Sequence, residues 1–167
     1  MIIVLRLIHI LCGVFWVGTL IFNSVFLGPA IREAGPEGGK VMGILVKNGL
    51  PKIMPVVAIL AILAGLALYD HNSAHFKMSY MQTNVGMAFG IGGVLAIITL
   101  ILGATILAPT LEHMGKIGQQ MASASPADKE RLTAELQGLR GKAKTFSNIV
   151  AVTGVLASAI MAIARYL

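Results

Sequence analysis

A histidine, an arginine, a cysteine and a tryptophan interrupt the apolar segment that opens the chain. On a helix with about 100° per residue, the polar positions of this segment fall within about 60° of one line. These positions are Arg6, His9, Cys12, Gly13, Trp16, Leu20 and Asn23. Lipid solvates the Ile, Val, Leu and Phe of the other faces but not this one. We therefore expect the polar face to point into a protein interior, where an ionisable residue indicates function.

His9 is the first candidate for chemistry, because imidazole is the usual axial ligand of haem iron. Helix bundles build such cofactor sites between facing helices. Trp16, two turns further along, can form a pocket wall, and Arg6 or Arg165 can pair with the haem propionates. Two alternatives stay open for His9. It can donate a hydrogen bond to a carbonyl of a neighbouring helix, or it can bind another metal or transfer a proton.

A second axial ligand is harder to assign. His9 lies about 10 Å below the start of its helix, whereas His71 follows the end of an apolar segment and is expected near the surface. Met87 and Met161 lie at depths closer to that of His9, and a thioether also ligates haem iron. A five-coordinate haem held by His9 alone is equally allowed.

The pair His71 and His75 offers a second kind of site. If this segment is helical, residues four apart share a face, and the two imidazoles can chelate one metal ion. The thioethers of Met78 and Met81 would favour Cu(I). The alternative is a solvated loop without a metal.

The composition is that of an integral membrane protein. The 167 residues are 56% hydrophobic and only 12% charged, whereas soluble domains carry about 25% charged residues. The net charge of +6 is small for a nucleic-acid binder, so we expect a lipid bilayer and no nucleic acid as partner. Cys12 is the single cysteine, which excludes an intramolecular disulfide. The first segment lacks the basic start and cleavage site of a signal peptide, so we expect it to be retained.

Four apolar segments meet the length of about 20 residues that a membrane-spanning helix needs. The sequence predicts a single-domain, all-α integral membrane bundle of four transmembrane helices. Small residues on spans 2, 3 and 4 favour close helix packing or a homodimer. Spans 3 and 4 can extend past the membrane as a cytoplasmic helical hairpin, and no internal repeat is evident. The predicted spans are approximately 2–30, 50–69, 83–108 and 146–166.

The basic residues predict the orientation of the chain. Ten of the thirteen Lys and Arg residues lie in the loops between spans 1 and 2 and between spans 3 and 4, if Lys52 at the very start of span 2 is counted with them. The positive-inside rule places these loops in the cytoplasm and both termini outside. His9, His71 and His75 then share the outer half of the protein.

The stretch LRLIHILCGVFWVGTLIF, followed by FLGPAIREAGPEGGKVM, resembles the opening of a group of small bacterial four-span membrane proteins of unassigned function. GLALYD, GIGG and the terminal ARYL fit the same group. More distantly, a first-span histidine followed by tryptophan and glycine is similar to CopD-like copper-resistance proteins and to HemJ-type protoporphyrinogen oxidases. In the latter, a histidine early in span 1 is associated with haem, and His9 is the matching position. The Leu-Pro-Arg run of that type is absent, and residues 23–29 stand in its place.

The resemblance implies a bacterial inner-membrane protein, and the residues lead to three functional hypotheses. The first is b-type haem binding for electron transfer or haem handling, with a redox partner. The second is a non-redox protein that handles copper or another small solute. The third is an accessory subunit of a larger membrane complex. The sequence shows no set of catalytic residues typical of a hydrolase or a transferase. If the protein is an enzyme, we expect a haem-dependent membrane oxidoreductase.

Overall fold

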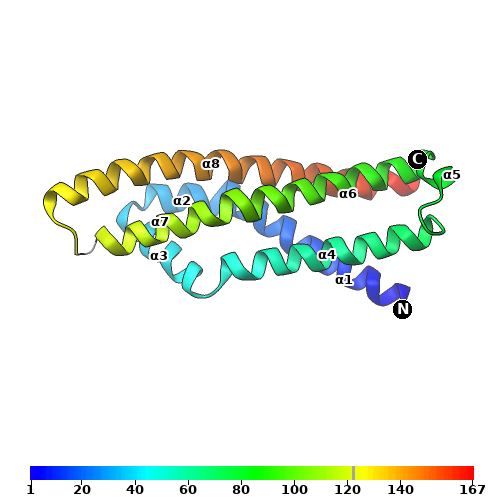
Figure 1. Ribbon diagram of the computed structural model, residues 1–167, viewed down its shortest axis with the longest axis horizontal. Helices are drawn as coiled ribbons and strands as arrows, with labels where there is room; N and C mark the ends of the chain where they lie inside the picture. The colour runs from blue at the N-terminus through cyan, green and yellow to red at the C-terminus, as the bar shows by residue number, and fades with distance from the viewer. Residues whose placement is uncertain (122) are drawn as a thin grey trace.

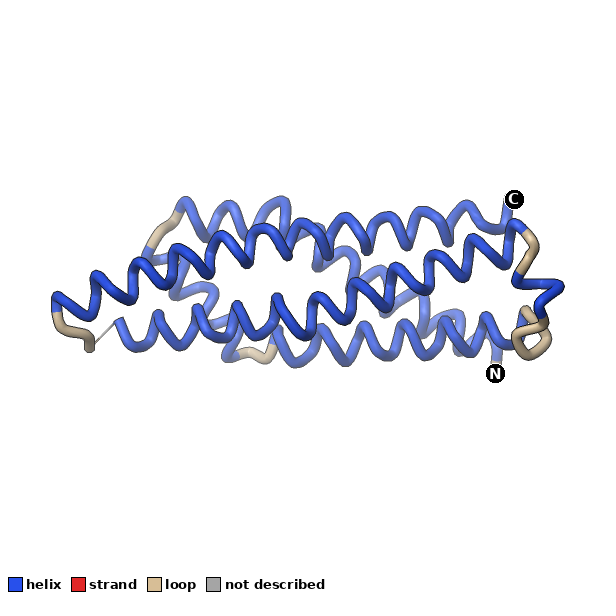
Figure 2. Tube along the Cα trace, turned by 45° about the horizontal axis from the view of Figure 1, so that its top comes forward, coloured by secondary structure: helices blue, strands red, loops and turns tan. Residues whose placement is uncertain are grey.

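The computed structural model describes residues 1–121 and 123–167, and every regular element among them is helical (Figures 1 and 2). Four helical segments lie side by side along the long axis, which confirms the predicted all-α bundle. Each is long and apolar enough to cross a membrane. They are Ile2–Glu33, Leu50–Asn72, Asn84–Met121 and Pro126–Tyr166. Both termini lie at one end, here termed the terminal end, and the opposite end is termed the hairpin end (Figure 1).

The first span is one continuous rod with a widened turn in it. Helix α1 (Ile2–Phe22) leads into a π-helical turn, η1 (Asn23–Leu27), and then into α2 (Gly28–Glu33). Pro29 follows this turn directly. A proline ring clashes with the carbonyl four residues earlier in a regular helix, and a π-helical turn is a known local distortion of the helix at such a point. The proline therefore bends the rod without ending it, and the helix continues past the predicted limit of residue 30.

The third span repeats this construction. Helix α6 (Asn84–Leu102) leads into a second π-helical turn, η2 (Gly103–Leu107), and then into α7 (Ala108–Met121). The two π-helical turns begin at Asn23 and Gly103, 80 positions apart. The same offset relates Pro29 to Pro109 and Thr19 to Thr99. The first and third spans therefore share one construction, a helix with a π-helical turn ahead of a proline.

The remaining helices connect and return these two rods. Helix α3 (Pro36–Lys47) and α4 (Leu50–Asn72) follow the first rod, and the single-turn α5 (Met78–Met81) precedes the second. Helix α8 (Pro126–Ile163) then runs back to the terminal end, where η3 (Ala164–Tyr166) closes the chain. The bounds of α4 extend the predicted second span by three residues.

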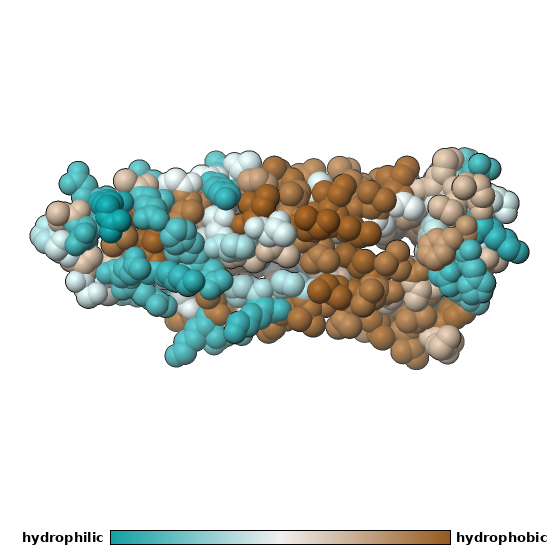
Figure 3. Space-filling model, viewed as in Figure 1, coloured by the Kyte–Doolittle hydropathy of each residue, from teal (hydrophilic) through white to brown (hydrophobic). Residues whose placement is uncertain are grey.

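The predicted extension of spans 3 and 4 as a helical hairpin is confirmed. Ser125 caps α8, because its side-chain oxygen accepts a hydrogen bond from the backbone N–H of Asp128. Ile117 of α7 and Leu132 of α8 are buried in the hairpin. Its surface is mostly hydrophilic, whereas a hydrophobic surface covers much of the rest of the bundle up to the terminal end (Figure 3). That apolar surface is suited to contact with lipid rather than water.

The four spans form two tight pairs, α1 with α4 and α6 with α8, and the pairs meet each other less closely. Small residues make each tight interface possible. Ala58, Ala61 and Ala64 of α4 are buried in the bundle. In the second pair, a Cβ added to Gly92 would lie 2.7 Å from Cγ of Met161. These small residues are thus used inside the chain, and the homodimer stays a prediction.

Candidate functional site

His9 is fixed against the neighbouring helix α4 by a hydrogen bond. Its Nδ1 lies 2.7 Å from the backbone oxygen of Ala61. A carbonyl oxygen can only accept, so Nδ1 carries the proton and donates it. In the neutral imidazole, Nε2 then carries the lone pair. A hydrogen bond from His9 to a carbonyl of a neighbouring helix was one of the alternatives that the sequence left open. This bond leaves Nε2 available for a ligand.

Gly65, one turn beyond Ala61 on α4, provides the room for the imidazole ring. A Cβ at this position would lie 2.8 Å from Cε1 and 2.9 Å from Nδ1 of His9. The ring therefore lies directly against the backbone of α4. Ala61 and Gly65 together define its position and its tautomer, and we refer to them as the imidazole seat.

The second ring nitrogen of His9 is accessible. Within the described part of the chain, the only hydrogen bond of the ring is that of Nδ1. No buried side-chain nitrogen or oxygen among the same residues lacks a partner, so Nε2 is not sealed inside the bundle. Nε2 is therefore placed to bind a metal centre or to accept a hydrogen bond from a ligand.

The other predicted haem-binding residues differ widely in burial. Trp16 is only 6% exposed, which confirms that the polar face of α1 points inward at that level. Arg6 and Arg165 are exposed at the terminal end, and the Arg165 guanidinium lies 6.0 Å from the ring centroid of Tyr166. Met87 is 46% exposed. Met161, by contrast, is partly buried and packs against Gly92.

The described residues do not form the shared helical face on which the sequence analysis placed His71 and His75. Helix α4 ends at Asn72, between the two histidines, so His71 and His75 do not share a helical face. The next residues have positive φ angles of 50°, 66° and 56°, at Ala74, His75 and Phe76. Within residues 1–121 and 123–167, no group of three or more His, Cys, Asp or Glu side chains is placed to hold a metal ion.

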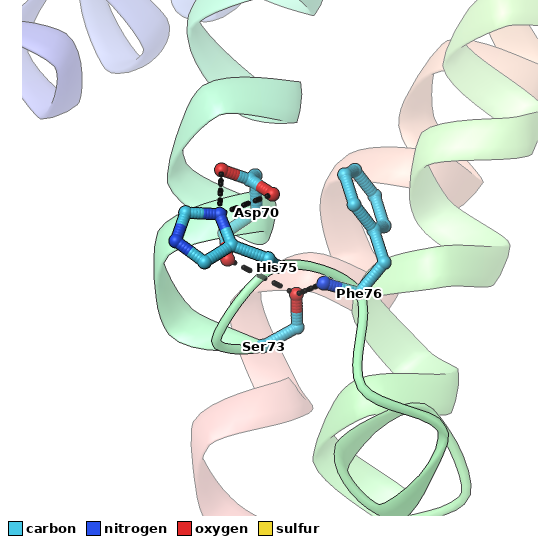
Figure 4. A network of polar contacts seen from close by, with 4 residues as sticks. All are labelled: Asp70, Ser73, His75 and Phe76. Carbon is cyan, nitrogen blue, oxygen red and sulfur yellow. Dashed lines mark hydrogen bonds and ion pairs between the residues drawn. The ribbon is translucent and has the colours of Figure 1, made fainter.

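The loop is instead organised around the buried Ser73 (Figure 4). Its hydroxyl donates a hydrogen bond to the backbone oxygen of Asp70 at 3.1 Å and accepts one from the backbone N–H of Phe76 at 2.8 Å. Nδ1 of His75 lies 3.1 Å from Oδ2 of Asp70, in an exposed pair. These contacts explain how the chain reverses direction here.

A cleft of about 170 Å³ lies between the two helix pairs, in the half of the bundle towards the hairpin end. Trp16 lines it, but His9 does not. Both π-helical turns contribute to its walls, as do Arg32, Arg140 and Lys144. The sequence analysis did not find this site. The prolines that follow the two turns, Pro29 and Pro109, are the sequence signal for them.

Neither a model of a known family, nor a curated protein, nor a solved structure matches this chain. The geometry of His9 and of the cleft is therefore the basis for the functional argument.

Proposed function

We propose that this chain is an integral membrane protein that binds b-type haem through Nε2 of His9, for electron transfer or haem handling. The observation that supports this is the hydrogen bond from Nδ1 to the backbone oxygen of Ala61. Metal-ligating histidines commonly donate their other ring N–H to a carbonyl or carboxylate, which fixes the tautomer and raises the basicity of the ligating nitrogen. In this chain the backbone oxygen of Ala61, part of the imidazole seat, accepts that N–H from His9.

The candidate residues supply an iron ligand and cations for the charged edge of the cofactor. Haem iron would supply one-electron chemistry at this position. Arg6, one turn from His9, and Arg165 are exposed cations suited to the propionates. Met87 is the more accessible of the two thioethers considered as second ligand. The cleft is lined by none of His9, Arg6, Arg165 and Met87. The proposal concerns the surface that Nε2 reaches and not the cleft.

The orientation that goes with this proposal places both termini outside and the helical hairpin in the cytoplasm of a bacterial cell. The support is the concentration of Lys and Arg in the loops of the hairpin end. His9 then serves the outer half of the inner membrane. A redox partner would act on that side.

The test is the visible spectrum of the purified protein, expressed with ample haem supply, before and after reduction with dithionite. We expect a Soret band and sharp reduced α and β bands, which His9→Ala removes. The matched control is His113→Ala, because His113 lies in the hairpin and its Nε2 pairs with Glu135 at 3.1 Å. His113→Ala should keep the spectrum. A featureless spectrum of the wild-type protein would reject haem binding.

The accessory-subunit and solute-handling hypotheses make no use of the imidazole seat. No specific contact in the described residues favours either of them over haem binding. They become the leading explanations if the spectrum is featureless.

A further inference from the structure

The cleft between the two helix pairs has the composition of a site for an amphiphile. Its walls are mainly apolar, with Leu20, Leu100 and Leu107 among them. Its lining includes the three cations Arg32, Arg140 and Lys144 and no acidic side chain. An apolar chamber with cations and no anion is complementary to an anion that carries a hydrocarbon chain.

The three cations are available for such an anion. Within the described residues, the salt bridges include none of Arg32, Arg140 and Lys144. Carboxylates of the same end pair with other cations, namely Glu37 with Lys40, Glu112 with Lys116 and Asp128 with Arg131. Three unpaired cations on one cleft attract a phosphate group and disfavour a zwitterion that brings its own cation.

The cations occupy defined positions at the cleft. The Arg32 side chain folds back along α2, since a Cβ on Gly28 would lie 3.4 Å from its Nη1. Arg140 and Lys144 are one turn apart on α8 and share a face. Asn148 continues that face and accepts a hydrogen bond of 2.6 Å from the Ser24 hydroxyl. This bond ties the first rod to α8 beside the cations.

The cleft is also long enough for a lipid chain. Sixteen residues separate Trp16 from Arg32, a rise of about 24 Å. The hydrocarbon core of a bilayer is roughly 30 Å thick, so the chains of one lipid need about half of that. The bends at η1 and η2 both border this space, and π-helical turns occur frequently at functional sites.

We propose that this cleft binds one anionic phospholipid, with its phosphate at Arg32, Arg140 and Lys144 and an acyl chain along the apolar walls towards Trp16. Basic pockets between transmembrane helices are known places for anionic headgroups. This proposal is independent of haem binding, because His9 does not line the cleft.

Trp16 is the single tryptophan of the chain and lines the cleft, so it reports directly on an acyl chain there. The full-length protein is reconstituted in phosphatidylcholine bilayers. Phosphatidylglycerol or phosphatidylcholine with brominated chains is then added at equal mole fractions. Each fluorescence reading is divided by that for the same lipid without bromine, which cancels any constant quenching by haem. We expect brominated phosphatidylglycerol to quench Trp16 at a much lower mole fraction than brominated phosphatidylcholine.

Two triple variants distinguish lipid binding at the cleft from attraction of the lipid by general surface charge. Replacement of Arg32, Arg140 and Lys144 by Gln should raise the half-quenching mole fraction of phosphatidylglycerol roughly tenfold or more. Replacement of Lys52, Lys129 and Lys142 by Gln removes the same charge outside the cleft and should leave it unchanged. Ala104→Leu fills the wall at η2 without a charge change and should also weaken quenching, which covers the case in which the first triple variant does not fold.

Three outcomes would overturn the proposal. They are equal quenching by the two phospholipids in the wild-type protein, equal loss in the two triple variants, and quenching by a brominated fatty acid but not by the phospholipid.

Discussion

Gly65 lies so close to His9 that a Cβ on it would come within 2.8 Å of the imidazole Cε1. The same ring donates its Nδ1 proton to Ala61, one turn earlier on α4. The close approach of Gly65 and the hydrogen bond to Ala61 therefore fix the His9 side chain of the first span against the second span. This arrangement sets the tautomer of His9 and is the structural reason for assigning a ligand to Nε2.

Gly65→Ala should therefore disturb His9 more than an ordinary glycine substitution. The added methyl group meets the ring, which has to move away from α4, and overpacking of this kind costs about 1–3 kcal/mol. We expect a lower unfolding midpoint in detergent and, in the haem-loaded protein, a weakened or shifted Soret band. Circular dichroism and absorbance measure the two effects.

Gly13→Ala is the matched control for that experiment. Gly13 lies on α1 beside the same polar face, and nothing lies within 4 Å of a Cβ added there. Alanine at this position should leave the spectrum unchanged and favour the helix by up to about 1 kcal/mol. Equal spectral effects of the two substitutions would contradict the role given to Gly65.

Gly92→Ala tests the second tight pair. A Cβ there would lie 2.7 Å from Cγ of Met161 and 3.2 Å from the backbone oxygen of Ala157. The flexible methionine can shift but the backbone cannot, so we expect a destabilisation of about 1–3 kcal/mol in thermal or denaturant unfolding. The neighbouring Gly93→Ala meets nothing within 4 Å and should be neutral or stabilising. A neutral Gly92→Ala would mean that α6 and α8 pack differently.

Ser73→Ala should loosen the connection between α4 and α5. The substitution leaves the backbone N–H of Phe76 without its 2.8 Å acceptor, and loss of such a partner costs about 1–3 kcal/mol. Hydrogen exchange should become faster at Phe76. Ser79→Ala, in the exposed α5, serves as the control and should have no effect. Unchanged exchange at Phe76 in the Ser73 variant would show that the loop does not depend on this hydroxyl.

Hydropathy was sufficient to predict the four spans but not where the helices end. The predicted limits of residues 30 and 108 lie next to Pro29 and Pro109, and the helices continue to Glu33 and Met121. Each of these prolines follows a π-helical turn, and the helix continues past it. Such turns are a property of the backbone, and the few identities at the 80-residue offset did not reveal them in the sequence.

The candidate site was predictable only in part. The inward direction of Trp16 followed from helical periodicity. The acceptor of His9 is a backbone carbonyl, and every residue has one, so no pattern of side chains could identify Ala61. For His71 and His75 the pattern was visible in the sequence, but the structure does not form the arrangement that it suggested. Their spacing suggested a shared helical face, but the helix ends between them at Asn72 and Ser73 reorganises the loop.

The most direct test of the account is the reduced-minus-oxidised spectrum of His9→Ala, recorded without and with added imidazole. The account predicts that the α and β bands of the wild-type protein are lost in the variant and return when free imidazole replaces the missing ligand. Bands that are identical in the variant and the wild-type protein would contradict the assignment of His9. Absence of the bands from wild-type protein made with ample haem would contradict haem binding itself.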